Sequence, residues 1–383
     1  MPTRTLALLL LAVPIAAVAA PAAVDATPPL VAPADVGMSE AVLRAGVTIF
    51  EEAVERDELK GAVLLVARRG RVVLHEAVGW RHEEAKLPME RDTLFRMASN
   101  TKPVIATAIL MLVEEERLSL DDNVRAYVPS WDNHRSAFVK IRHLLSHTSG
   151  LRIPTLFLEP MMEPSAEHPD APSLQLEAAR FGEVGPEFPP GTSYAYNNPG
   201  YNTLGALIEI ASARPLKDFL RERIYAPLGM VDSYNHEPNA PQDRMARIDR
   251  RRDGEWTVQW TPGDDPDVPF PRASGGMIST AADYFRLLQL WLEGGALDGV
   301  RLISEESARA ATRDQTGGVS GDRYGFGWAV SADGSFGHGG SDGTWAWVDP
   351  AREIVGLVFT QSPGGDIPSQ QFRRVVEAAI ADE

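Results

Sequence analysis

The sequence lacks several features that would each have indicated a particular class of protein. It contains no cysteine in 383 residues, which excludes disulfide bonds, thiolate metal sites and a cysteine nucleophile. Basic side chains are in deficit, because 37 lysines and arginines face 53 aspartates and glutamates and the formal net charge is −16. A general nucleic-acid-binding protein needs a basic surface to neutralise phosphates, so we expect no nucleic-acid partner.

Long apolar runs are also absent, with one short exception at the N-terminus. Residues 5–18 are almost entirely apolar, follow the basic side chain of Arg4 and precede a small-residue cleavage site at residues 17–19. This three-part pattern predicts a secretory signal peptide over residues 1–19 and export to the periplasm or the medium. The alternative is a membrane anchor, but the run is shorter than the roughly 20 residues that a spanning helix needs. We therefore expect no stable membrane span once the signal is removed.

The rest of the chain has the composition of a globular domain. Apolar residues make up 44% and charged residues 23%, close to the ordinary globular average. The length corresponds to one large domain or to two closely packed ones. Residues 20–36 are rich in alanine and proline and predict a flexible lead-in. We expect the folded domain over residues 37–383.

The order of strand and helix patterns predicts the architecture of this domain. A β-branched hairpin pattern at residues 61–79 turns at Arg69-Gly70, and further strand patterns lie within residues 324–361. Helical periodicity dominates about residues 101–290. We therefore predict an α/β plus all-α fold. An antiparallel sheet from both chain ends, flanked by helices, carries an inserted helical subdomain.

Three segments give less regular patterns. Residues 154–190 are rich in proline, glutamate and alanine, and we expect a functional loop or an irregular helical excursion there. The run Arg250-Arg251-Arg252 is expected to form a solvated turn. Tyr324–Val330 is expected to be a strand.

The chemistry begins at Ser99-Asn100-Thr101-Lys102, directly before a long apolar helical pattern. Pro103 is tolerated only in a first helical turn, so we expect Ser99 at or just before the N-terminus of this helix. The spacing places Lys102 one turn along on the same face. A buried lysine has a lowered pKa and can take a serine proton, and a helix N-terminus favours the negative charge that develops. Alone, this spacing also fits a capping serine and a surface lysine.

Two further motifs follow in order along the chain. Tyr196-Asn197-Asn198 lies in a polar and aromatic segment, and Gly337-His338-Gly339-Gly340-Ser341 precedes an expected strand at residue 344. Together the three motifs resemble the ordered set of the penicillin-recognising serine hydrolases. The chain is similar to the class C β-lactamase-related group, which includes DD-peptidases, D-aminopeptidases and carboxylesterases. Flanking segments at residues 144–151 and 275–280 agree, and the resemblance implies a β-lactamase/transpeptidase-like fold.

The resemblance implies a role for each motif residue. Ser99 is the nucleophile that becomes acylated, and Lys102 helps to remove its proton. Tyr196 is the second proton carrier, either as a phenolate base or as a relay to the leaving group; a phenolate needs nearby cations, because the pKa of a free tyrosine is about 10. Asn198 holds Lys102 and the acyl amide of the substrate. The backbone N–H groups of Ser99 and Ser341 form the oxyanion hole.

The remaining candidate residues line the opposite wall of the implied cleft. His338 contacts Tyr196 or the substrate, and Gly340 helps to orient the substrate. Trp345 follows the third motif closely enough to contact a substrate, although packing in the core explains a tryptophan there equally well.

No cofactor and no metal ion are expected. His143 and His147 are spaced like two metal ligands on a helix, but the glutamate of the His-Glu-x-x-His pattern is missing. They lie in a segment that the resemblance already explains, so we expect a structural role for both. The expected partner is a small-molecule ester or peptide substrate, and the sequence leaves the oligomeric state open.

Departures from the family pattern narrow the expected activity. The β-lactamases of this group have Lys-Thr-Gly where this chain has His338-Gly339-Gly340, and the lysine and threonine there help to bind the β-lactam carboxylate. Gly339 has no hydroxyl, and an unperturbed histidine is mostly neutral near pH 7.

We therefore predict an exported serine hydrolase that acts through an acyl-enzyme on esters or on small amide or D-amino-acid peptide substrates. The alternatives are a β-lactamase or a penicillin-binding DD-peptidase. A non-catalytic relative that binds peptidoglycan is less favoured, because Ser99, Lys102 and Tyr196 are all present. The sequence does not fix the natural substrate.

Overall fold

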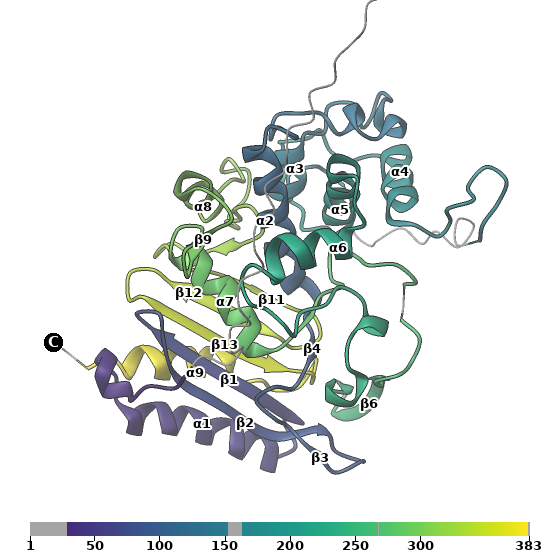
Figure 1. The fold of residues 1–383 in the computed structure, drawn as a ribbon. Coiled ribbons are helices and arrows are strands. Elements are labelled where there is room, and N and C mark those ends of the chain that lie inside the picture. Colours follow the sequence, from purple (N-terminus) through teal and green to yellow (C-terminus); the bar gives the residue numbers. More distant parts are fainter. Residues whose placement is uncertain (1–28, 152–162, 267, 382–383) are drawn as a thin grey trace, which may run out of the picture.

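The computed structural model describes residues 29–151, 163–266 and 268–381 (Figure 1). The signal peptide predicted over residues 1–19 lies outside these residues, as does most of the lead-in predicted over residues 20–36. The end of the lead-in differs from the prediction. Pro33–Val36 forms a short 3₁₀ helix in which Val36 is buried, so this part packs against the domain.

A seven-stranded antiparallel sheet, built from both ends of the chain, forms the centre of the α/β part. The strand order is β10-β11-β12-β13-β1-β2-β3. The two chain ends meet where β1 pairs with β13, from Ala62 opposite Thr360 to Arg68 opposite Ile354. The predicted fold class is therefore confirmed. The strands are β1 (Gly61–Arg68), β2 (Arg71–His82), β3 (Leu87–Pro88), β10 (Ala329–Val330), β11 (Phe336–Gly339), β12 (Trp345–Asp349) and β13 (Ile354–Thr360).

Local chemistry explains the hairpin between β1 and β2. Arg69 and Gly70 have φ values of 53° and 73°, and two successive positive values are what a tight two-residue hairpin turn requires. All eight residues of β1 are buried. A strand covered on both faces is a continuous apolar run rather than an alternating one, which matches its sequence.

Helices cover both faces of the sheet. α1 (Glu40–Glu55) and α9 (Ser369–Ala378) pack together on one face, with Phe50 and Phe372 in edge contact at 5.6 Å between ring centroids (Figure 1). α7 (Ala281–Leu292) packs on the other face, against β1 and β13. The sheet therefore has two apolar cores, and the motif residues lie on the side of α7.

The helical subdomain packs around α5 and joins the α7 side of the sheet through α2 (Figure 1). Its α-helices are α2 (Thr101–Glu114), α3 (Ile141–Leu145), α4 (Leu174–Val184), α5 (Asn198–Ser212) and α6 (Leu216–Leu220). α2 is buried along almost its whole length, because the sheet-side core surrounds it. The helical subdomain was predicted over about residues 101–290. This range extends too far toward the C-terminus, because α7 packs on the sheet.

Several local predictions differ from the structure. Residues 154–190 were predicted to be irregular, and residues 152–162 lie outside the described residues. In the described part of this segment, α4 is a regular helix, and the side chain of Ser173 caps its N-terminus. The basic run predicted as a turn belongs to β5 (Ile248–Arg252), which pairs with β6 (Glu255–Trp260). Only Ala329–Val330 of the strand expected from residue 324 is a strand.

The strands and the α-helix not yet named are short. Among these residues, no helix is long and apolar enough to span a bilayer. The remaining elements are β4 (Phe95–Arg96), β7 (Ile278–Ser279), β8 (Ala296–Leu297), β9 (Val300–Arg301) and α8 (Glu305–Ala311).

Candidate active site

Ser99 lies in a tight turn directly before α2, as the position of Pro103 predicted. The short 3₁₀ helix Ala98–Asn100 forms this turn, and Ala98 has a φ of 45°, in the left-handed region that residues with a side chain rarely adopt. The side chain of Asn100 donates to the hydroxyl of Thr344 at 2.9 Å, which ties the turn to the sheet. Strained backbone of this kind often accompanies functional sites, where the surrounding structure holds it in place.

The side chain of Lys102 is completely buried beside Ser99. Its Nζ donates to the Ser274 carbonyl oxygen at 2.9 Å and to Asn198 Oδ1 at 3.0 Å, and lies 3.1 Å from Ser99 Oγ. Burial, and to a smaller extent the positive charge of Arg272, lowers the pKa of Lys102 well below the ordinary 10.5. A neutral amine has two N–H donors and one lone pair. Once Lys102 has lost its proton, the two acceptor oxygens can use both donors, and the lone pair then faces the hydroxyl of Ser99.

Tyr196 hydrogen-bonds Ser99, and the centroid of its ring lies 4.8 Å from Lys102 Nζ. Burial raises the pKa of Tyr196 above the ordinary value of 10, although the hydrogen bond to Ser99 acts in the opposite direction. Because burial disfavours the phenolate, the environment of Tyr196 favours a phenol that relays a proton over a phenolate base.

Asn198 is the first residue of α5, and the local sequence fixes its position. Asn197 is the N-cap of this helix, and its side chain accepts the Gly200 N–H at 2.8 Å. Pro199 occupies the first turn, where its missing N–H costs no hydrogen bond. The helix start thereby holds the Asn198 side chain against Lys102.

His338 lies on β11 and engages both ring nitrogens within the protein. Nδ1 lies 2.9 Å from the Gly339 carbonyl oxygen and must therefore carry the proton, while Nε2 accepts from the Tyr324 hydroxyl at 2.9 Å. Burial, assisted by the nearby Lys102, lowers the pKa of His338 to about 3. The ring is therefore neutral at physiological pH. It lies 6.1 Å from the Tyr196 ring between centroids, so it borders that residue without offering a cation.

Gly340 allows β11 to approach the turn that carries Ser99. A Cβ at this position would lie 2.4 Å from both the Met97 carbonyl oxygen and the Thr344 hydroxyl, which is far inside any normal contact. Gly340 lines neither of the two cavities described next. Its part is thus the close approach of two backbones rather than the direct contact with substrate that was predicted.

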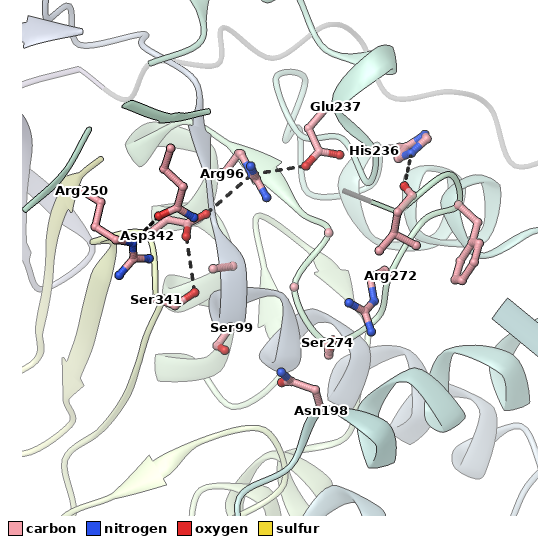
Figure 2. A pocket seen from close by; sticks show the side chains of 16 residues that line it. Arg96, Ser99, Asn198, His236, Glu237, Arg250, Arg272, Ser274, Ser341 and Asp342 are labelled. Atoms are coloured by element: carbon pink, nitrogen blue, oxygen red, sulfur yellow. Dashed lines mark hydrogen bonds and ion pairs between the residues drawn. The ribbon is translucent and has the colours of Figure 1, made fainter. Parts of the chain in front are cut away.

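A cavity of about 250 Å³, called here the smaller cavity, opens beside Ser99 (Figure 2). Ser99, Asn198 and Ser341 all border it, so both backbone N–H groups predicted for an oxyanion hole belong to residues of this cavity. Its wall is strongly ionic. The charged side chains in the wall are Arg96, Glu237, Arg250, Arg272 and Asp342.

A second cavity of about 540 Å³, called here the larger cavity, lies on the other side of the Ser99–Tyr196 hydrogen bond. The two cavities share no lining residue. Its wall combines aromatic and aliphatic side chains with two charged ones, Asp322 and Arg323. The lining residues are Tyr194, Tyr196, Gly321, Asp322, Arg323, Tyr324, Ala329, Val330, Ala332, His338 and Gly339.

Trp345 does not lie where the sequence predicted. Side chains alternate between the two faces along β12, so Trp345 and Trp347 share a face and stack at 4.6 Å between ring centroids. Trp345 packs against the core beneath α1 and α9, whereas Ala346 and Val348 face the core on the side of the site. The prediction that Trp345 contacts the substrate is therefore wrong, because strand alternation turns it to the opposite face.

Some contributors were missed because the sequence carries little signal for them. Ser274 acts through its carbonyl oxygen, which no side-chain pattern reveals. The glycines that follow it, at residues 275–276, belong to a flanking segment on which the family resemblance rests. Arg272 forms an ion pair with the buried Glu177 at 3.0 Å, across two segments far apart in the chain. Tyr324 lies in a segment expected to be a strand and instead binds His338.

The two histidines considered as metal ligands each accept a backbone N–H. Nδ1 of His143 accepts from Lys140 at 3.1 Å, and Nδ1 of His147 accepts from Asn197 at 3.2 Å. Within the described ranges, no group of three or more histidine, aspartate or glutamate side chains could hold a metal ion.

Known proteins share both the sequence pattern and the fold. The family model described as Beta-lactamase matches residues 47–380. Esterase EstB from Burkholderia gladioli is 32% identical over 310 residues, which cover 73% of this chain and 76% of the esterase. Penicillin-binding protein 4 from Amycolatopsis lactamdurans is 30% identical over 331 residues, covering 81% and 83%. A penicillin-binding protein homologue from Caulobacter crescentus superimposes with a TM-score of 0.72 at 25% identity, covering 90% of this chain and 98% of that one. The chain therefore belongs to the beta-lactamase family and is a serine hydrolase of that family.

Proposed function

We propose that the protein is an exported hydrolase that acts through an acylated Ser99 on esters, or on small amide or D-amino-acid peptide substrates, with esters preferred. The observation that carries this proposal is the buried amine of Lys102. Its Nζ donates to the Ser274 carbonyl oxygen and to Asn198 Oδ1 and lies 3.1 Å from Ser99 Oγ. A weak nucleophile is thereby paired with an amine whose pKa is lowered by burial, which makes its neutral, basic form more accessible. Export rests on the sequence of residues 1–19.

Acylation can be written with the residues that surround Ser99. Ser99 Oγ forms a bond to the ester carbonyl carbon as its proton passes to Lys102 Nζ. The carbonyl oxygen becomes an oxyanion, which the backbone N–H groups of Ser99 and Ser341 stabilise. The bond from carbon to the leaving oxygen then breaks. That oxygen takes a proton from the Tyr196 hydroxyl, and Tyr196 is reprotonated from Lys102, so an alcohol leaves and the amine is neutral again.

Deacylation uses the same groups in reverse. A water molecule gives a proton to the base formed by Lys102 and Tyr196 and attacks the acyl carbon. The Ser99–carbon bond breaks, Ser99 regains its proton, and the carboxylic acid is released.

The preference for esters over β-lactams rests on β11. His338 is neutral because its pKa is lowered to about 3, and Gly339 has no hydroxyl, so this strand offers neither a cation nor a hydroxyl to a β-lactam carboxylate. Esterase EstB, one of the relatives, is named for ester hydrolysis. An ester without a carboxylate needs no such anchor.

A fluorophosphonate probe tests the nucleophile. We expect the wild type to be labelled and Ser99→Ala to remain unlabelled, because only a serine activated by a base reacts at a useful rate. Ser146→Ala is a matched control, since this buried serine donates to a backbone carbonyl, with no basic amine as partner. Equal labelling of the wild type and of a folded Ser99→Ala protein would rule out Ser99 as the nucleophile.

The pH dependence tests the base. The active form has a neutral Lys102, so kcat/KM for 4-nitrophenyl acetate should rise with pH as the amine loses its proton. Because burial lowers this pKa, the rise should be complete well below pH 10.5. Lys102→Arg keeps a permanent cation and should lose about 10²–10⁴-fold in kcat at every pH.

His338 provides the control for this pH profile. Its pKa of about 3 lies below the pH range measured, so the acid limb should keep its midpoint in His338→Gln. A limb that disappears in His338→Gln and persists in Lys102→Arg would assign the titration to the histidine and contradict the proposed base.

A substitution on β11 tests the preference for esters. The wild type should hydrolyse 4-nitrophenyl butyrate with a higher kcat/KM than nitrocefin. Gly339→Thr should raise the nitrocefin-to-ester ratio, because a hydrogen bond to a charged group contributes about 1.5–3 kcal/mol, or roughly 10- to 150-fold. Gly339 pairs with Trp345 and also borders the larger cavity, and a Cβ at this position would lie 3.7 Å from Trp345, its nearest neighbour, so the new side chain has room. An unchanged ratio in Gly339→Thr would mean that the hydroxyl lies on the face of Trp345 rather than toward the substrate.

Gly339→Val is the matched control for this test, because valine has the shape of threonine without the hydroxyl. It should leave the ratio near the wild-type value. If the wild type already hydrolyses nitrocefin faster than the ester, the β-lactamase alternative replaces the proposed preference.

A further inference from the structure

We propose that the site selects esters that combine a small polar acyl group with a larger, flat and apolar leaving group. This inference rests on the proposed ester hydrolysis and adds which half of the substrate each cavity takes. The two cavities adjoin at the Ser99–Tyr196 hydrogen bond and share no lining residue, so the two halves of a bound ester lie in different surroundings.

Proton transfer decides which half enters which cavity. The leaving oxygen must lie beside the hydroxyl that protonates it, and Tyr196 borders only the larger cavity. The acyl group remains on Ser99, which borders the smaller cavity together with Asn198 and Ser341. The acyl half therefore extends into the smaller cavity and the leaving group into the larger one.

The smaller cavity suits a short and polar acyl group. Its volume is about 250 Å³, and it is bordered by an ionic network in which Arg96 pairs with Glu237 at 3.3 Å and with Asp342 at 3.6 Å (Figure 2). Arg272, also in the wall, pairs with the buried Glu177. An apolar acyl group would remove water from these charges without replacing its hydrogen bonds, which is unfavourable.

The larger cavity suits an apolar and planar group. Its volume is about 540 Å³, and the rings of Tyr194, Tyr196 and Tyr324 belong to its wall. This wall has two charged side chains, those of Asp322 and Arg323, against five in the wall of the smaller cavity. The rings of Tyr194 and Tyr324 lie 6.2 Å apart between centroids, and Val330 adds an aliphatic surface. Aromatic side chains stabilise a flat apolar group through burial and through stacked or edge contacts.

Two isomeric esters test this assignment. Benzyl acetate and methyl phenylacetate have the same atoms and release alcohols of similar acidity, but they place the phenyl ring on opposite sides of the scissile bond. We expect kcat/KM to be at least about tenfold higher for benzyl acetate, the size of effect that a hydrophobic pocket produces for a single group. Ala329→Trp, which fills part of the larger cavity, should lower this ratio. Ala351→Trp, at an exposed turn away from the site, should not.

Each outcome of this test decides the proposal. Equal rates, or faster hydrolysis of methyl phenylacetate, would overturn the assignment of the two cavities and leave the proposed hydrolase intact. Hydrolysis of neither ester together with no labelling of Ser99 would overturn the proposed function itself. If Ser99 is labelled but both esters turn over too slowly, protection of Ser99 against the probe by each ester gives the same comparison. Stronger protection by methyl phenylacetate would then overturn the assignment.

A separate set of contacts concerns His147, and we infer that this residue positions Tyr196 for catalysis. Its carbonyl oxygen accepts the Ala195 N–H at 2.9 Å, and its Nδ1 accepts the Asn197 N–H at 3.2 Å. One residue therefore holds the backbone on both sides of Tyr196. The ring of His147 also lies 4.3 Å from the Tyr196 ring between centroids.

The environment of His147 fits a residue that positions Tyr196 rather than one that carries a proton. The side chain is completely buried, and burial lowers its pKa well below 6.5, so the ring stays neutral. Nδ1 accepts a hydrogen bond, so the proton is on Nε2, for which the described residues supply no hydrogen-bond partner. His147 reaches no reacting atom. It acts through the location of the Tyr196 hydroxyl, and small displacements of a catalytic group are costly.

The test uses two substitutions whose side-chain amides reach the positions of different nitrogens of the His147 ring. Asparagine places an acceptor close to the position of Nδ1, and it tolerates the φ of 57° found at His147. Glutamine reaches toward Nε2 instead. We expect His147→Asn to keep most of the wild-type kcat for 4-nitrophenyl acetate, whereas His147→Gln and His147→Ala lose at least about tenfold in kcat with little change in KM.

Two controls separate positioning of Tyr196 from general stability. In the Tyr196→Phe background, His147→Ala should cost less than about twofold in kcat, since residues that act as a unit are not additive. His143→Ala removes a similar acceptor of a backbone N–H from α3, the helix that precedes His147, and should change the Tm more than it changes kcat. A full additional loss in the Tyr196→Phe background would overturn the inference, as would a His147→Asn protein no more active than His147→Gln.

Discussion

The removal of the Lys102 amine from water is the constraint on which the rest of the site depends. A buried ammonium is unfavourable, so burial favours the neutral amine, which has two donors and one lone pair. Each of these three directions needs one partner, and Ser274, Asn198 and Ser99 supply them from three separate segments. The orientation of the base toward the nucleophile therefore follows from hydrogen-bond satisfaction.

This arrangement requires the sheet and the helical subdomain to pack together correctly. Ser99 lies on the turn into α2, Asn198 on the start of α5, and Ser341 follows β11. The turn is held against the sheet by Asn100, and the approach is close enough that Gly340 has no room for a side chain. The site therefore forms only at the junction, once strands from the C-terminal end of the chain have joined the segment that carries the nucleophile.

The sequence predicted those parts of the site that depend on local spacing or on ordered motifs. Ser99 and Lys102 are three residues apart at a helix start, so their proximity follows from helical geometry. The face occupied by Trp345 depends on the register of β12, and one position along a strand reverses the face of a side chain. Ser274 contributes a carbonyl oxygen, and α4 has weak apolar periodicity, so neither gave a usable side-chain signal. The ion pair of Arg272 joins segments that only the tertiary fold brings together.

The distribution of charge divides the site into two regions with different tasks. Burial lowers the pKa of Lys102 and of His338 and raises the pKa of Tyr196, so it favours the neutral form of all three groups that exchange or border protons. Permanent charges occur beside them, in the wall of the smaller cavity. Arg272 connects the two regions, because its positive charge helps to lower the pKa of Lys102 while its ion pair with Glu177 limits how far that charge acts. The ionic wall that we assign to the acyl group therefore also helps to keep the base in its reactive form.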